Sequence, residues 1–294
     1  MDVKLMTHNV NGIGDFKTRK RYFNFLSKLK KDIILLQETH STEKDEPWWR
    51  NQIRSDIIFS HGTSISRGVC IILRRSSDIK LLDSVKDKIG RFICIKVEVH
   101  KEIFVIFNVY APNNEKEHVD FFTDLYLKLQ EFNDEGHKCI IGGDFNFIQD
   151  LDMDREGGNM RTVWKRSCTT IGKLKEYFCL IDIWRTRNQT TKRYTWRRYN
   201  PYVQSRLDFW LITETLQTVV VENDIHPCVL SDHDYVTLHL HTEKQKVGPS
   251  YWKFNNSLLR NEEFVTALSD SFSSWVDEYE QKHDKKNVVG LAEI

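Results

Sequence analysis

The sequence predicts an α/β fold in which two β-sheets pack together and helices lie on the outside. Apolar runs of strand length alternate with segments that carry apolar residues at helical spacing. Two strand candidates, 91–99 and 102–109, are separated only by His100 and Lys101, which predicts a tight antiparallel hairpin. A purely doubly wound parallel sheet is therefore excluded, and a two-sheet sandwich with outer helices fits both observations.

The individual elements follow from periodicity and composition. Short runs rich in β-branched and aromatic residues predict strands over 3–8, 32–37, 68–73, 91–99, 102–109, 138–143, 206–212 and 235–241. Apolar residues at helical spacing predict helices over 17–30, 116–132 and 167–178.

The chain divides into a large domain and a C-terminal extension. The strand pattern stops near Thr242, so one domain is expected over 1–242. Residues 243–250 are polar with a Gly-Pro breaker, which is typical of a linker. The extension 251–294 contains an acidic, helix-compatible segment, 261–284, with large apolar side chains on one face.

Composition limits the class of protein. With 294 residues, 40% of them hydrophobic, the chain can bury one large core or two smaller ones. No apolar run approaches the roughly 18 residues of a membrane span, so a soluble, non-secreted protein without a membrane partner is expected. The six cysteines are widely spaced without a Cys-x-x-Cys pair, which predicts reduced thiols and no zinc site.

The charges are nearly balanced overall but not along the chain. A net charge of +1 gives no global argument for a nucleic-acid partner. The segment 185–206, however, contains seven Arg or Lys and no acid, interleaved with Tyr and Trp. Such a segment can pair cations with phosphates while aromatic rings contact bases. A solvated basic hairpin is the alternative that the segment alone leaves open.

Short polar clusters flank the predicted strands, at the ends where loops can converge on one active site. They are Asn9-Val10-Asn11-Gly12, Gln37-Glu38-Thr39-His40, Asn108-Val109-Tyr110-Ala111-Pro112, Gly143-Asp144-Phe145-Asn146, Ser205-Arg206-Leu207-Asp208 and Ser231-Asp232-His233.

These clusters carry the residue types that phosphoester cleavage needs. The carboxylates and amides of the clusters supply oxygen ligands for a hard divalent ion, and Mg²⁺ needs only one or two protein carboxylates when phosphate oxygens and waters complete its shell. His233 can act as acid or base near neutral pH, and Asp208 is a candidate to orient its ring. In isolation, an Asp-His pair fits a solvated loop better than a catalytic pair.

Taken together with Asp154-Arg155 and Tyr194-Thr195-Trp196, the series resembles the endonuclease/exonuclease/phosphatase superfamily. Within it, the chain resembles the apurinic/apyrimidinic endonuclease-like domain of LINE-type (non-LTR) retrotransposons. The matching motifs run from 9 to 233 in the family's order. The stretch 251–259 also resembles the segment that joins this endonuclease to the reverse transcriptase in such polyproteins, so 251–294 is expected to lead toward a reverse transcriptase.

The resemblance implies a four-layer α/β sandwich, with two packed mixed β-sheets flanked by helices and a loop-lined groove for duplex DNA. Glu38 would be the principal metal ligand, helped by Asn11 and Asp232. Asn11 stands where relatives of the repair type carry Asp, which would make the metal shell less anionic. Mg²⁺ is the expected ion, with Mn²⁺ as a substitute.

The resemblance also implies roles in catalysis. Asp144, held by Asn146, would orient or deprotonate the attacking water, although His233 remains an alternative general base. Asn9 and Tyr110 would hold the scissile phosphate. The full implied catalytic set is Asn9, Glu38, Tyr110, Asp144, Asn146, Asp208, Asp232 and His233. DNA contacts are expected from Arg155, Thr195, Trp196, Arg197, Arg198, Arg206 and Ser231.

The implied activity is a Mg²⁺-dependent DNA endonuclease that nicks one strand and leaves a 3′-hydroxyl to prime target-primed reverse transcription. Its partners would be double-stranded DNA, the element RNA and the reverse transcriptase domain of the full-length polyprotein, and the substrate implies a nuclear location. Alternatives left open are an abasic-site repair endonuclease, a phosphatase of the same superfamily and an inactive DNA-tethering domain.

Overall fold

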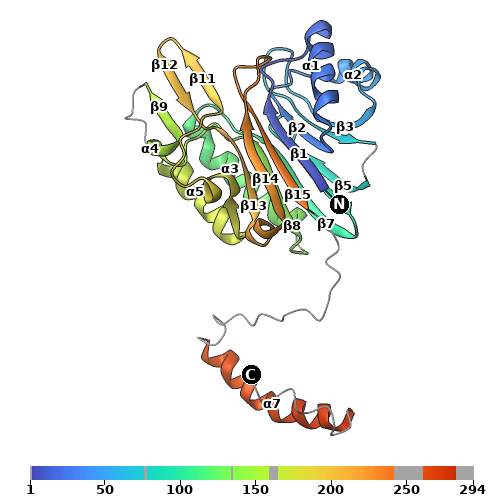
Figure 1. Cartoon of the computed structure of the whole chain (residues 1–294), viewed down its shortest axis with the longest axis vertical. Coiled ribbons are helices and arrows are strands. Elements are labelled where there is room, and N and C mark those ends of the chain that lie inside the picture. The colour runs from blue at the N-terminus through green and yellow to red at the C-terminus, as the bar shows by residue number, and fades with distance from the viewer. Residues whose placement is uncertain (1, 76–77, 134, 159–164, 242–260, 283–294) are drawn as a thin grey trace. The chain divides into compact units, whose positions relative to one another are not determined.

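The computed structural model describes residues 2–75, 78–133, 135–158, 165–241 and 261–282 (Figure 1). The chain forms two compact units, Met1–Lys244 and Gln245–Ile294. The predicted linker 243–250 and the residues that follow it up to 260 lie outside the described part of the chain. Of the second unit, the described part is helix α7 (Glu262–Lys282), where a helix was expected.

The first unit contains two six-stranded sheets. The first sheet has the order β14-β15-β1-β2-β4-β3, and only β1 and β2 pair in parallel. Its strands are β1 (Asp2–Asn9), β2 (Ile33–Gln37), β3 (Ser55–Ser60), β4 (Val69–Arg74), β14 (Val220–His226) and β15 (Tyr235–His241). Because β1 and β2 run in the same direction, their carboxyl ends place Asn9 and Glu38 at the same edge.

The second sheet has the order β10-β13-β8-β7-β6-β5, with β7 and β8 parallel. Its strands are β5 (Ile79–Lys86), β6 (Phe92–Val99), β7 (Glu102–Tyr110), β8 (Lys138–Asp144), β10 (Leu180–Asp182) and β13 (Asp208–Thr213). The predicted tight hairpin is present between β6 and β7, where His100 and Lys101 have φ values of 51° and 71°. Two successive positive φ values are typical of the type I′ turn that fits the twist of a hairpin.

Helices cover the outer face of each sheet (Figure 1). The helices α1 (Phe16–Leu29) and α2 (Glu46–Gln52) pack on the first sheet, and α3 (Glu115–Phe132) and α5 (Lys165–Tyr177) pack on the second. The short helices are α4 (Leu151–Asp154) and α6 (Ile183–Arg187), with 3₁₀ turns at Glu43–Asp45 and Glu214–Val219. The predicted four-layer α/β sandwich is confirmed. None of the described helices is long and apolar enough to cross a membrane.

The alternation of side chains along the strands produces the layers. On β2, Ile33 and Leu35 face the second sheet, whereas Ile34 and Leu36 face α1. All four are buried, which is why β2 reads as a continuous apolar run rather than as an alternating one. Burial on both faces fixes the register, because a slip by one residue would exchange the two sets.

Several strands were not predicted. Three of them form a small third sheet of order β11-β12-β9, with β11 (Trp196–Tyr199), β12 (Tyr202–Ser205) and β9 (Arg155–Gly157), and the edge strands β3, β10 and β14 of the two large sheets were missed as well. The edge strand β5 was also missed, because its side chains are largely exposed and Leu81 and Leu82 give it no alternating pattern. The hairpin β11–β12 lies within the basic segment 185–206, where a hairpin was expected.

A buried polar link joins the two sheets close to the active-site edge. Gln37 on β2 donates from Nε2 to Asn108 Oδ1 on β7 at 2.6 Å. Asn108 Nδ2 in turn donates to the carbonyl oxygens of Leu36 and Cys70, at 3.0 and 2.8 Å. Because both amides are fully buried, these bonds fix how the strand ends of the two sheets meet.

We expect Asn108→Ala and the larger Asn108→Leu each to lower the free energy of unfolding by about 2–3 kcal/mol, because either change removes one acceptor of the Gln37 amide and the side-chain donor to two buried carbonyls. Urea denaturation of both variants measures this. Ile106→Val on the same strand is the packing control and costs about 1 kcal/mol. Wild-type stability of Asn108→Leu would show that the amide only fills space.

Candidate active site

Two acids meet where β8 ends and β13 begins. Asp208 lies directly opposite Asp144 in the antiparallel pairing of these strands. Both carboxylates are at most 1% exposed. The close approach depends on Gly143, whose φ is 152° and at which a Cβ would collide with the carbonyl oxygen of Val109 on β7. The strand pairing therefore places two buried negative groups side by side.

His233 reaches this acid pair from the first sheet. It lies in the loop before β15, and its Nδ1 is 2.8 Å from Asp208 Oδ2. The hydroxyl of Thr195 donates to the same oxygen at 2.6 Å. Because Nδ1 donates to Asp208, Nε2 is the nitrogen that can face a substrate. One ligand-type atom each of Asp144, Asp208 and His233 lies within 4.8 Å of the others.

Asp144 is held by residues from both sheets. Asn9, at the end of β1, donates from Nδ2 to Asp144 Oδ2 at 2.8 Å. The backbone N–H of Asn146 donates to Oδ1 at 2.9 Å, and the Asn146 side chain donates to the Ala111 carbonyl at 3.0 Å. Asp144 thus has a fixed orientation at the junction of the two sheets.

The buried groups have shifted pKa values. Burial, and next the charge of Asp208, raise the pKa of Asp144 above its ordinary value. For His233, burial alone would lower the pKa, but the charge and hydrogen bond of Asp208 outweigh burial and raise it. The imidazole therefore favours its charged, hydrogen-bond-donating form, and Asp144 becomes a stronger base than an exposed aspartate.

A second group of oxygen atoms lies at the more exposed edge of the site. Asn11 donates from Nδ2 to Asp232 Oδ1 at 2.9 Å, and the backbone N–H of Gly12 donates to the Glu38 carbonyl at 2.8 Å. The Tyr110 hydroxyl donates to the Glu38 carboxylate. Carboxylate and amide oxygens on Glu38, Asp232 and Asn11 are the donor types that fit a hard divalent cation.

The loops that carry these residues are bent into the left-handed region. Asn11, Glu38, His40 and Asn146 have φ values of 46°, 49°, 53° and 48°. Asn tolerates this conformation, whereas a glutamate held there costs about 1–2 kcal/mol. Backbone strain of this kind at the ends of β1, β2 and β8 is typical of a functional site, where the position of the side chains matters more than an unstrained backbone.

The basic hairpin β11–β12 is attached directly to the loop 231–234, which carries His233. Trp196 forms a backbone bridge with His233, and its indole N–H donates to Asp232 Oδ2 at 3.0 Å. Arg197 pairs with Asp234 at 2.7 Å, while Arg198 is exposed. Of the predicted DNA contacts, Trp196, Arg197 and Arg198 therefore lie together beside the site.

Two further predicted contacts are also near the hairpin or the loop. Arg155 is half-buried on β9 and lies opposite Ser205 of β12. The hydroxyl of Ser231 donates to the Asn9 carbonyl at 2.8 Å and accepts from the His233 N–H at 3.2 Å. Ser231 thus shapes the loop 231–234. DNA contacts from Arg155 and Ser231 stay predictions.

Arg206 and Thr195 were wrongly predicted to contact DNA. Arg206 is 1% exposed, and its guanidinium pairs with Asp154 and Asp182, each at 2.8 Å. Thr195 is fully buried, and its hydroxyl donates to Asp208 while it accepts from the Asp208 N–H at 3.1 Å. Both side chains are buried, and the hydrogen bonds and ion pairs that they form go to partners inside the protein.

Sequence reasoning missed His8 and Arg91. His8 is buried, its Nε2–H donates to the His233 carbonyl at 3.0 Å, and its Nδ1 accepts from the Tyr22 hydroxyl at 2.5 Å. The Arg91 guanidinium lies 4.8 Å from the centroid of the Tyr110 ring and donates to the Ala111 carbonyl at 3.1 Å. A histidine between two polar cluster residues, Thr7 and Asn9, was the available signal for His8.

Comparison with known proteins places this geometry in a family. The model of the Endonuclease/Exonuclease/phosphatase family matches residues 6–233. A protein from Xenopus laevis described as "Transposon TX1 uncharacterized 149 kDa protein" is 30% identical over 280 residues. That match covers 94% of this chain but only 21% of the relative, so the chain spans about a fifth of the relative's length.

Solved structures share the fold. AP endonuclease LMAP from Leishmania major has a TM-score of 0.71 at 16% identity, with 82% of this chain and 88% of that chain covered. The APE2 catalytic domain from Xenopus laevis has a TM-score of 0.67 at 19% identity, with 80% and 91% covered. An AP endonuclease from Archaeoglobus fulgidus has a TM-score of 0.63 at 21% identity, with 80% and 98% covered.

The buried His8 gives the stability a pH dependence of defined sign. Burial lowers its pKa to about 4, below the unfolded value of 6.5, so the unfolded chain takes up this proton first as the pH falls. The contribution is complete above about pH 6.5 and is lost toward pH 4, which amounts to about 2 kcal/mol between pH 7.5 and pH 5. Urea denaturation of wild type and His8→Gln at these two pH values measures the difference. An equal loss of stability in both proteins would contradict this assignment.

Proposed function

The chain belongs to the Endonuclease/Exonuclease/phosphatase family, and we propose that within this family it is a Mg²⁺-dependent DNA endonuclease that nicks one strand and leaves a 3′-hydroxyl. The observation that carries the proposal is the convergence of Asp144, Asp208 and His233 within 4.8 Å, beside oxygen donors on Glu38, Asn11 and Asp232. A basic hairpin joined by its backbone to the same loop supplies a surface for a polyanion.

The source of the proposed endonuclease is a retroelement. The similarity to a transposon protein over 94% of the chain supports this origin. In such an element the 3′-hydroxyl would prime reverse transcription at the target site, with the element RNA and a reverse transcriptase domain as partners. We expect the protein to act in the nucleus, where that target lies.

Glu38, Asn11 and Asp232 would hold the metal ion, and Mn²⁺ would substitute for Mg²⁺. The ion would neutralise charge that develops on the phosphate oxygens during cleavage. Both oxygens of Asp232 accept a hydrogen bond, from Asn11 and from Trp196, which fixes the carboxylate before any ion arrives. The contact from Tyr110 does the same for Glu38.

The protein groups divide the remaining chemistry between them. Asp144, with its raised pKa and its two hydrogen bonds, would orient the attacking water and accept its proton. His233, with its pKa raised by Asp208, would donate a charged hydrogen bond from Nε2 to the phosphate. Asn9 would help to hold the scissile phosphate, since its amide already lies against Asp144. This assignment favours Asp144 over His233 as the general base.

Two other activities use a site of this kind. An abasic-site endonuclease shares the fold, and the similar solved structures are described as AP endonucleases at 16–21% identity. A phosphatase would not need the hairpin on which Arg197 and Arg198 lie together beside the catalytic loop. Substrate choice in the following experiment separates these activities.

We expect the purified chain to nick supercoiled plasmid in Mg²⁺, to lose this activity in EDTA, and to regain it in Mn²⁺. His233→Ala should reduce nicking by at least about a thousandfold, because the phosphate loses its charged donor. Mapping of the ends should show 3′-hydroxyls.

The control is His239→Ala, a histidine of β15 outside the site. Cleavage of an abasic duplex without nicking of intact DNA would favour the repair activity. Absence of cleavage on both substrates would contradict the nuclease.

Asp208→Asn should lower the single-turnover rate by at least about a hundredfold while the melting temperature stays within a few degrees. An asparagine can donate an N–H to His233 Nδ1, which favours a tautomer without a proton on Nδ1, and the substitution removes the charge that keeps the imidazole protonated. The pH dependence of cleavage should shift to lower pH in this variant. Near-normal rates would reject the proposed pairing in catalysis.

Arg197→Ala combined with Arg198→Ala should weaken DNA binding and reduce its salt dependence. Arg198→Ala alone should do so while cleavage at saturating DNA is retained to within a few fold. Arg198→Ala alone is the cleaner test, because Arg197 also pairs with Asp234 next to the catalytic histidine. The matched control is Lys80→Ala with Lys86→Ala on the exposed face of β5. Unchanged binding in the hairpin variants would reject this surface as the DNA contact.

A further inference from the structure

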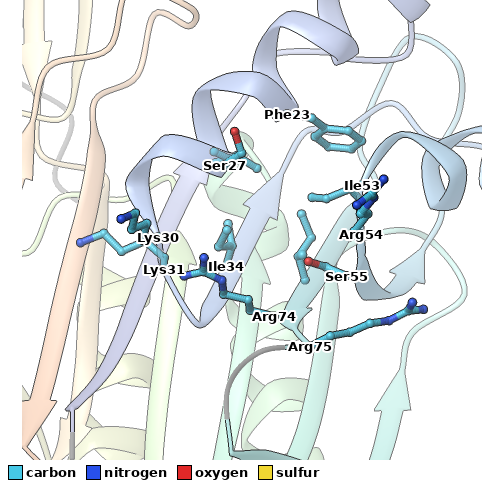
Figure 2. A pocket seen from close by; sticks show the side chains of 12 residues that line it. Phe23, Ser27, Lys30, Lys31, Ile34, Ile53, Arg54, Ser55, Arg74 and Arg75 are labelled. Atoms are coloured by element: carbon cyan, nitrogen blue, oxygen red, sulfur yellow. The ribbon is translucent and has the colours of Figure 1, made fainter.

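A basic cavity of about 290 Å³ lies between the end of α1 and the strands β2, β3 and β4 (Figure 2). It is far from the catalytic end of the first sheet. Glu38 follows the last residue of β2, whereas the cavity is lined by Ile34 near the start of that strand. At about 3.3 Å per residue, the two positions are about 13 Å apart along the strand.

The pairing of β4 with β2 also separates the cavity from the active-site edge. It runs antiparallel to β2, with Leu36 opposite Cys70 and Ile33 opposite Leu73. Its first residues therefore lie near the active-site edge, and its last residues, Ile72 and Arg74, reach the cavity. The cavity is thus separate from the site to which the proposed nuclease activity belongs.

The floor of the cavity is apolar. Phe23 and Leu26 of α1 line it together with Ile34, Ile53 and Ile72. Four of these five side chains are buried in the outer core of the first sheet, so the cavity opens onto a rigid aliphatic surface. A cavity of this size holds one or two apolar side chains.

The rim carries one sign of charge. Among the twelve described residues that line the cavity, five are Lys or Arg and none is Asp or Glu. Figure 2 shows these five, Lys30, Lys31, Arg54, Arg74 and Arg75, around the apolar residues. Acids lie near the rim but outside the lining. Asp56 pairs with Arg75 at 3.0 Å, but both groups are more than half exposed, so this pair is weak. Glu222 and Asp32 interact electrostatically with Lys31.

We propose that this cavity is a docking site for an acidic peptide segment of a protein partner, with one or two apolar side chains of the segment inserted into the floor. Apolar burial would anchor the segment, and carboxylates on either side of the anchor would face the five cations. The charge pattern gives the occupant its chemistry, because carboxylates of a bound segment would complement a lining that contains five cationic residues and no acidic one.

A nucleic acid fits this cavity less well than a peptide. Single strands bind through bases stacked on exposed aromatic rings. The lining contains one aromatic residue, Phe23, which is only 4% exposed, and the rest of the floor is aliphatic. Leu, Met or Phe side chains match such a floor, whereas a base would bury polar edges against it.

The test is fluorescence anisotropy with the labelled peptide Asp-Glu-Asp-Leu-Phe-Asp-Glu-Asp and the full chain at low salt. We expect saturable binding with a Kd of about 1–100 µM. Replacing Leu-Phe of the peptide with Ser-Ser should weaken binding about tenfold, because the anchor is lost. A twelve-nucleotide single-stranded DNA should compete poorly.

Variants of the chain place the binding at the cavity. Lys30→Glu with Arg54→Glu should weaken peptide binding at least tenfold, whereas Lys80→Glu with Lys86→Glu on β5 serves as the charge-matched control and should bind as wild type. Ser27→Trp, which extends into the cavity from an exposed position of α1, should block binding without loss of a core contact.

Plasmid nicking by each variant should equal that of wild type, since the active site is not changed. The proposal is overturned if no saturable binding occurs below about 1 mM, if the Ser-Ser peptide binds equally well, or if the oligonucleotide competes effectively. Wild-type affinity in both cavity variants would also overturn it.

Discussion

The Asp208 carboxylate is the group on which the geometry of the candidate site depends. Its strand pairing with β8 sets it opposite Asp144, and its Oδ2 accepts hydrogen bonds from both His233 and Thr195. Its charge also raises the pKa values of Asp144 and His233. A residue of β13, the loop before β15 and the residue that precedes β11 therefore meet at one oxygen atom. Because a buried carboxylate without donors would cost several kcal/mol, the fold and the site stabilise each other through this contact.

A buried ion cluster supports the approach to Asp208. Arg206 lies two residues earlier, and Asp154 and Asp182 hold its guanidinium with less than 2% of the side chain exposed. For Arg206, burial alone would lower the pKa, but the charges of Asp182 and Asp154 raise it above its ordinary value. For Asp154, burial alone would raise the pKa, but Arg206 and Arg185 lower it below its ordinary value, so both groups keep their charged forms. Buried ion pairs seldom add net stability compared with apolar residues. Here they fix the backbone position of Arg206, and therefore the point at which the chain enters β13.

The sequence allowed the layers and the site to be predicted because the strands that build them are apolar on both faces and end in polar residues, as β2 does before Glu38 and β8 does at Asp144. It did not allow the edge strands to be predicted, since exposed strands such as β5 lack a one-sided pattern. It also misassigned Arg206, because a run of basic residues looks like a surface when its acidic partners, Asp154 and Asp182, lie up to 52 residues away in the chain. Burial of a charge is a property of tertiary pairing and leaves no local signal.

The basic hairpin, which is the proposed DNA surface, and the loop 231–234 are joined directly by hydrogen bonds. The indole of Trp196 holds Asp232, the backbone of the same residue bridges to His233, and the backbone N–H of Asp234 donates to the Thr195 carbonyl at 2.6 Å. A displacement of the hairpin by bound DNA would therefore move an expected metal ligand, Asp232, and the His233 imidazole together. Affinity and chemistry are separable at Arg198, which is exposed, but are coupled at Trp196 and Arg197 through Asp232 and Asp234. Since both couplings pass through carboxylates next to His233, the sequence Asp232-His233-Asp234 is where recognition of a duplex would be transmitted to the scissile phosphate.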